Sequence, residues 1–126
     1  MACKEILAMV DQLEALGGSA ELKALELCLA ERIRQIVIEE RSPAFDLAER
    51  QKGELSAAAA AYSAHVHQGS VSFKATQKQP SGPSRPLTCW PFPIVTWKPT
   101  SIRRSAEKAI ALMLAELSRL IRAEIQ

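Results

Sequence analysis

The 126-residue chain is poor in aromatic residues, which make up 5% of it, and its three cysteines form no CxxC pair. With so few rings, leucine, isoleucine, valine and alanine must build most of the core, and that composition suits helices. An odd number of widely spaced cysteines indicates reduced thiols, and therefore a cytoplasmic protein. We also expect no signal peptide and no membrane partner, because acidic residues interrupt the apolar runs.

Signatures of catalysis are also missing. The sequence contains no GxSxG, HExxH, Walker loop or dinucleotide fingerprint. Cys89 with His65 or His67 allows a thiolate pair or part of a metal site, but nothing in the spacing requires either. At a helix end, which we favour for this segment, the two imidazoles point apart and cannot chelate together. We therefore predict no enzyme, no cofactor and no metal site.

Acidic residues are absent from one stretch, residues 68–100, which lies between helix-like segments. This stretch holds six of the seven prolines, both tryptophans and two of the three phenylalanines. Residues 1–67 carry eleven acids and seven bases, whereas residues 68–126 carry three acids and nine bases. An acidic half and a basic half can attract each other, or the basic half can face an anionic partner.

Apolar residues recur at three-to-four spacing in four segments of the chain, which predicts four helices. These helices are expected over residues 2–16, 20–41, 43 to the histidines, and about 101–125. Glycines 17 and 18 should end the first helix, and Ser42-Pro43 should separate the second from the third. Gly53 can bend or split the third helix. The wide apolar stripes of the second and last helices are compatible with a homodimer.

Within residues 68–100 the helical pattern gives way to alternation. Val71, Phe73 and Ala75 alternate with polar residues, which predicts a strand over 70–76 that could pair with a second short strand over 94–97. We therefore expect one mainly α domain, residues 1–126. Its four helices would form an irregular bundle, with a small β-hairpin or extended proline-rich arm, residues 68–100, inserted before the last helix.

Cations and aromatic rings are interleaved in this arm and at the start of the last helix. The candidate partner-binding residues are Lys74, Lys78, Arg85, Trp90, Phe92, Trp97, Lys98, Arg103, Arg104 and Lys108. Such a set suits a protein interface or a nucleic acid. Packing of the tryptophans over the helices is the alternative that needs no partner.

Three of these cations lie at the positive end of the last helix, where the helix dipole disfavours them. A bound anion could compensate for them, and so could this chain's own acids. Glu39 and Glu40, near the end of the second helix, are the acids that we expect in this role.

The sequence thus predicts a small non-catalytic binding protein, a regulator or inhibitor of a larger protein complex. It would engage its partner through the basic, aromatic arm and the N-terminus of the last helix. The alternative is a nucleic-acid-binding protein that uses the same basic surface.

Overall fold

Five α-helices and one short 3₁₀ helix make up the structure, a computed structural model that describes residues 3–50, 52–76 and 90–125. The elements are α1 (Cys3–Ala15), α2 (Ser19–Val37), α3 (Pro43–Glu49), α4 (Glu54–Thr76), the 3₁₀ helix η1 (Ile94–Thr96) and α5 (Ile102–Ile125). No strand occurs among the described residues. The prediction of a mainly helical chain is therefore confirmed.

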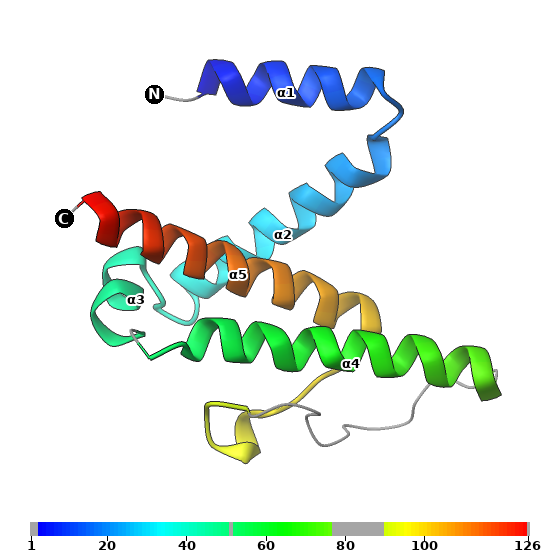
Figure 1. Ribbon diagram of the computed structural model, residues 1–126, viewed down its shortest axis with the longest axis vertical. Helices are drawn as coiled ribbons and strands as arrows, with labels where there is room; N and C mark the ends of the chain where they lie inside the picture. Colours follow the sequence, from blue (N-terminus) through cyan, green and yellow to red (C-terminus); the bar gives the residue numbers. More distant parts are fainter. Residues whose placement is uncertain (1–2, 51, 77–89, 126) are drawn as a thin grey trace.

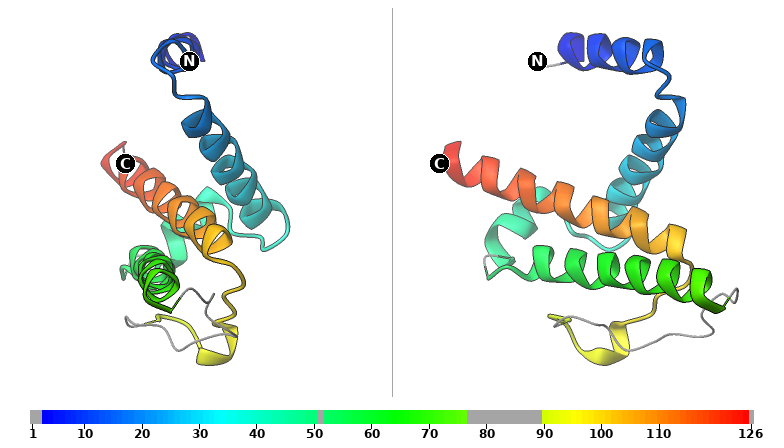
Figure 2. Two further views of the ribbon diagram at one scale, coloured as in Figure 1. Left: turned by 90° about the vertical axis from the view of Figure 1, so that its right-hand side faces the viewer. Right: turned by 45° about the vertical axis from the view of Figure 1, so that its right-hand side comes forward.

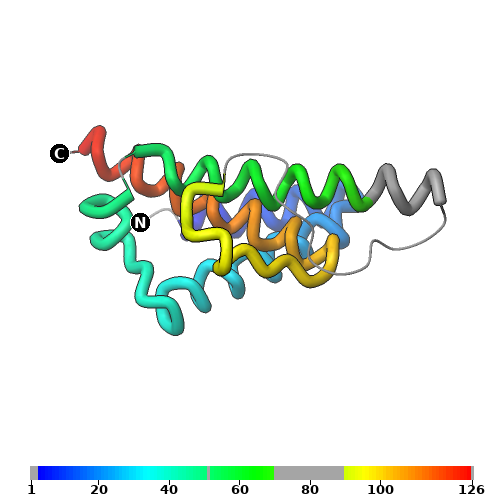
Figure 3. The backbone as a smooth tube through the Cα atoms, turned by 90° about the horizontal axis from the view of Figure 1, so that it is seen from below, coloured from blue at the N-terminus to red at the C-terminus, as the bar shows by residue number. Residues whose placement is uncertain are grey.

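The helices are arranged around an antiparallel pair, α4 and α5, which lie side by side (Figure 1). α2 and α3 both pack against α5, whereas α1 is joined to α2 by a turn and extends away from this pair with no buried residue (Figures 1 and 2). Seen from below, residues 90–100 lie across the α4–α5 pair (Figure 3). The pair is therefore the body on which the candidate site is built.

The turn between α1 and α2 lies at Gly17 and Gly18, the two glycines predicted to end the first helix. Gly17 has a φ of +85°, in the left-handed region that glycine adopts without strain. The backbone N–H of Gly18 donates to the carbonyl of Leu13 at 2.9 Å and closes the end of α1.

The predicted third helix is two helices, so the helix count of four was too low. Ser42 begins α3 as expected, because its Oγ accepts a hydrogen bond from the backbone N–H of Phe45 at 3.1 Å. α3 then ends at Glu49, and Gly53, with a φ of +80°, precedes the first residue of α4. The left-handed conformation at Gly53 cannot belong to a continuous right-handed helix, and the chain is therefore divided there.

The predicted strand over residues 70–76 is wrong, because these residues form the last part of α4. Once a helix has formed, each added residue gains a backbone hydrogen bond at low cost, and a short alternation does not outweigh that gain. His65 and His67 accordingly lie within a helix that continues past them, and not at its end.

The second predicted strand, over residues 94–97, is wrong as well. Residues 94–96 form η1, in which the N–H of Thr96 donates to the carbonyl of Pro93 at 2.9 Å. Prolines at 91, 93 and 99 surround this segment and cannot donate ladder hydrogen bonds. The part of the expected hairpin between these segments, residues 77–89, lies outside the described residues.

The core lies between α4 and α5, where small side chains let the two backbones approach. Its buried members are Leu55, Ala58, Ala59, Ala61, Tyr62, Trp97, Leu112 and Ala115. Trp90 and Phe92, from the segment that follows α4 in the described chain, pack against this cluster. The aromatic part of the predicted arm therefore completes the core on one side.

Candidate functional site

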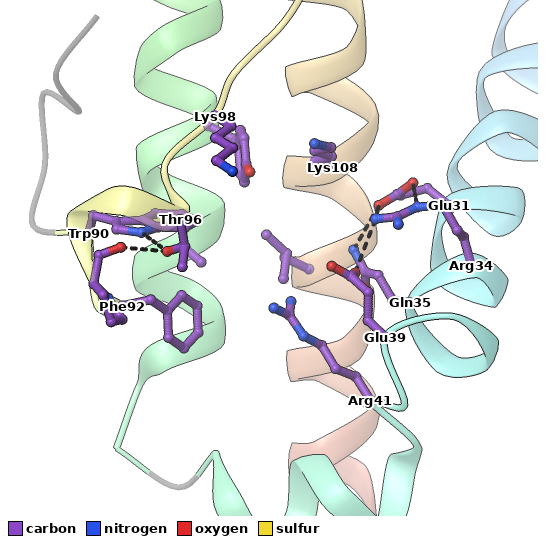
Figure 4. A pocket seen from close by; sticks show the side chains of 14 residues that line it. Glu31, Arg34, Gln35, Glu39, Arg41, Trp90, Phe92, Thr96, Lys98 and Lys108 are labelled. Atoms are coloured by element: carbon purple, nitrogen blue, oxygen red, sulfur yellow. Dashed lines mark hydrogen bonds and ion pairs between the residues drawn. The ribbon is translucent and has the colours of Figure 1, made fainter. Parts of the chain in front are cut away.

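A cleft of about 370 Å³ lies where residues 90–98 approach α2 and α5. Figure 4 shows its two sides: residues 90–98 stand over α4 on one side, and the end of α2 and the following loop form the other, with α5 between them. One side is aromatic and the other is ionic.

The aromatic side is a stack of rings built on Tyr62 of α4. The Tyr62 and Trp97 ring centroids are 5.0 Å apart, and those of Trp97 and Trp90 are 4.9 Å apart. Trp97 is only 6% exposed, so it anchors the segment in the core. Trp90 and Phe92 remain half-buried, with centroids 5.4 Å apart, and both line the cleft.

The ring of Trp90 is held in place by a local hydrogen-bond relay (Figure 4). Its indole Nε1–H donates to Oγ1 of Thr96 at 3.0 Å, and the Thr96 hydroxyl donates to the carbonyl of Pro93 at 2.6 Å. η1 brings these three residues together. The indole therefore presents a fixed face to the cleft.

The ionic side is organised around Glu31, a carboxylate that is 2% exposed. Its oxygens accept two hydrogen bonds of 2.9 Å from Arg34 and one from Nη2 of Arg104. Burial alone raises the pKa of Glu31, but the hydrogen bonds and charges of Arg34 and Arg104 lower it below its ordinary value. Glu31 is therefore held as a carboxylate.

The predicted pairing between the start of the last helix and the acids of α2 exists, but through a different acid. Arg104 pairs with Glu31 on the buried face of α2, whereas Glu39 pairs with Arg34 at 3.0 Å. The carboxylate that is already buried offers the stronger interaction, because little water competes there.

Two lysines face the cleft without an acidic partner. Among the described residues, no carboxylate lies within ion-pair distance of Lys98 or Lys108. The Lys108 Nζ lies 5.4 Å from the centroid of the Tyr62 ring. Burial and the nearby charge of Arg104 lower the pKa of Lys108. The positive charge there lacks full compensation.

Gln35, which also lines the cleft, has a side-chain oxygen that accepts no hydrogen bond from the described residues. This side chain is 2% exposed, and its Nε2 donates to Glu31 at 3.3 Å. Its Oε1 is buried, and no donor from the described residues reaches it. Buried polar atoms rarely stay unpaired, so a donor supplied from the cleft would stabilise this group.

The predicted partner-binding residues are placed in several different settings. Trp90, Phe92, Lys98 and Lys108 line the cleft, Trp97 lies in the core, and Arg104 pairs with Glu31. Arg103 is exposed, and its Nε lies 3.7 Å from Oε2 of Glu107. Lys74 belongs to the last turn of α4. Lys78 and Arg85 lie outside the described residues. The structure brings four of the ten together.

Sequence reasoning missed the α2 side of the cleft. Glu31, Arg34 and Gln35 come from that helix, and Arg41 comes from the loop that follows it. The available signal was a group of four charged or amide side chains, Glu31, Arg32, Arg34 and Gln35, on either side of Ile33.

Elsewhere, no group of three His, Cys, Asp or Glu side chains converges in the described part of the chain. His65 is buried, and its Nδ1 lies 2.7 Å from Oγ of Ser105. None of the described helices is long and apolar enough to span a membrane.

Comparisons with protein-family models, with curated proteins and with solved structures found no match to this chain. The functional argument therefore rests on the geometry of the cleft.

Proposed function

We propose that this chain is a small non-catalytic binding protein that holds an acidic segment of a larger protein partner in the cleft, and so acts as a regulator or inhibitor. Lys98 and Lys108 would bind the acidic groups. Trp90 and Phe92 would pack against the neighbouring apolar part of the segment. The observation that carries this proposal is the pair of lysines, Lys98 and Lys108, that no carboxylate of the described residues reaches, beside a fixed aromatic side.

The charge of the cleft supports an anionic ligand. Four basic side chains and two acidic ones line it. Both acids, Glu31 and Glu39, are engaged by arginines. An incoming carboxylate would therefore meet free ammonium groups, and a charge-assisted hydrogen bond to one of them contributes roughly 1.5–3 kcal/mol.

The size and distribution of the charge favour a protein segment over a nucleic acid. The cleft of about 370 Å³ is closed on two sides, whereas a nucleic-acid strand needs a groove that follows its backbone. Arg103 and Arg104 could extend a basic stripe, but both already have acidic neighbours, Glu107 and Glu31. Nucleic-acid binding is therefore the alternative that the test must separate.

The experiment is a titration of the full chain followed by tryptophan fluorescence, because Trp90 lines the cleft. The ligands are a glutamate-rich peptide containing leucine, the same peptide with glutamine in place of glutamate, and a single-stranded oligonucleotide. We expect the acidic peptide alone to bind. Lys98→Glu should weaken its binding about tenfold or more, since one charge-assisted contact is lost and a repulsion is added.

Lys52→Glu is the matched control, because it makes the same charge change at an exposed lysine outside the cleft. Lys108→Met is a second test variant that keeps the packing of the stem on Tyr62 but removes the charge. Equal loss of binding in Lys98→Glu and Lys52→Glu would contradict the site. Binding of the oligonucleotide with a steep salt dependence would instead support the nucleic-acid alternative.

A further inference from the structure

α5 carries apolar side chains on two opposite faces. Its inner face contributes Leu112 and Ala115 to the core between α4 and α5. Its outer face carries a row of larger side chains that are 37–54% exposed: Ile110, Met113, Leu114, Leu117, Leu120 and Ile121. A helix that covers a single core needs one apolar stripe, so the second stripe indicates a second packing layer.

The outer face of α5 adjoins a groove floored by small residues. The groove, of about 360 Å³, lies between α4 and α5, and Ser56, Ala59, Ala60 and Ser63 line its α4 side. Ile110 and Met113 line its α5 side. These two residues also begin a second apolar groove, of about 320 Å³, that runs along α5 to Leu120. The same face of the α4–α5 pair therefore carries a projecting row of apolar side chains and, beside it, a groove lined by small side chains.

The exposed apolar side chains of α5 gather on this one face. Eighteen large apolar side chains among the described residues are exposed, and six of them form the outer row of α5. Nine of the others belong to residues 6–38. A standard interface removes about 800 Å² from each partner, and a row of six large apolar side chains beside a groove supplies the apolar centre that such an interface needs.

We propose that a second copy of this chain covers this face, so that the outer row of α5 in each copy packs into the α4–α5 groove of the other. A two-fold interface uses the same patch on both copies, and such a patch must contain both the projecting and the receiving element. This face contains both. Packing of the rows of one helix into the grooves of another is the ordinary mode of helix association.

Two features of the row favour a second copy over other occupants. Ile110, Met113, Leu117 and Leu120 follow alternating steps of three and four residues, the spacing with which one helix packs along another, and this chain itself supplies such a helix. None of the six side chains in the row is charged, so a nucleic acid would find no phosphate contacts there. The proposal is independent of the cleft ligand, because none of the six lines the cleft.

The test is sedimentation velocity of the full chain over a wide range of concentration, with circular dichroism to follow the helices. We expect a species of twice the 13.8 kDa chain mass. Leu117→Glu, on the row, and Ala60→Glu, in the groove, should each convert it to a monomer with unchanged helix content. Ile94→Glu is the matched control, because Ile94 is 61% exposed but belongs to η1.

A wild-type chain that sediments at the mass of one copy at every concentration would overturn the proposal, and so would a dimer that both glutamate variants leave intact. If either glutamate variant loses helix content, Met113→Gln with Leu117→Gln replaces it, since glutamine is a good helix former. A monomer that binds vesicles of anionic phospholipid would identify the face as a membrane surface and would also overturn the proposal.

Discussion

Arg104, in the first turn of α5, donates a hydrogen bond from Nη2 to Oε1 of Glu31 on the buried face of α2, 73 positions away in the chain. The cation is disfavoured at this positive helix end, and a buried acid from another helix neutralises it. Glu31 also accepts two hydrogen bonds from Arg34 of its own helix. Through Arg104 this one carboxylate joins α2 to α5, and it forms the floor of the ionic side of the cleft.

Glu31→Gln should therefore lower the free energy of unfolding by about 2–3 kcal/mol. Fully buried pairs lose roughly 3–5 kcal/mol when one partner is removed, but the side chains of Arg34 and Arg104 are 36% and 32% exposed and regain some hydration. Urea unfolding followed by circular dichroism measures the change. Glu26→Gln is the control: its pair with Lys23 is largely exposed, and its loss should cost under about 1 kcal/mol. Similar losses in the two variants would contradict the role of Glu31.

The two tryptophans should differ in their contribution to stability. Trp97 is buried against Tyr62 and Leu112, so Trp97→Ala should cost about 3–5 kcal/mol, whereas the half-buried Trp90 should cost clearly less. Chemical unfolding of the two variants tests this order. A larger loss from Trp90→Ala would mean that the ring stack is anchored at the cleft and not in the core.

His65 should make stability depend on pH in mildly acidic solution. Burial lowers the pKa of His65 below its ordinary value of 6.5. Just below pH 6.5 the unfolded chain therefore binds a proton that the folded chain does not, so the free energy of unfolding falls as the pH falls through this window. The slope contributed by one such group is at most about 1.4 kcal/mol per pH unit.

The measurement is urea unfolding of the wild type, His65→Gln and His67→Gln between neutral pH and the mildly acidic range. We expect His65→Gln to flatten the pH dependence. His67 lies on the same helix but is exposed, which makes it the control, and its substitution should leave the slope unchanged. Parallel slopes in all three proteins would show that another group is responsible.

The helices could largely be predicted from sequence because their signals are local. Gly17 and Ser42-Pro43 mark boundaries through their own backbone preferences, and the structure shows boundaries at both. The sequence predicts a last helix that begins at about residue 101, and the structure shows Oγ of Ser101 accepting a hydrogen bond from the backbone N–H of Arg104 at 3.0 Å. Gly53 also indicated an irregularity in the third predicted helix, but the sequence alone did not distinguish a bend in that helix from a division into two.

The wrong strands and the missed half of the cleft have a common origin in tertiary structure. The alternation of Val71, Phe73 and Ala75 is a two-residue pattern, but whether it forms a strand depends on a partner strand, and residues 94–96 form η1 instead. The contact of Glu31 with Arg104 spans distant helices, and no local pattern specifies it. Basic and aromatic composition could identify Trp90, Phe92, Lys98 and Lys108, but not the helix that faces them.

The most direct test of the account is a map of where an acidic peptide binds, read from amide shifts in ¹⁵N NMR spectra of the full chain. We predict that the glutamate- and leucine-containing peptide shifts the indole N–H of Trp90, the side-chain amide of Gln35 and the backbone N–H of Lys98. The signals of Arg103 and Arg122, exposed cations outside the cleft, should move little. Shifts confined to those two arginines, with Trp90, Gln35 and Lys98 unchanged, would contradict the claim that the cleft is the binding site.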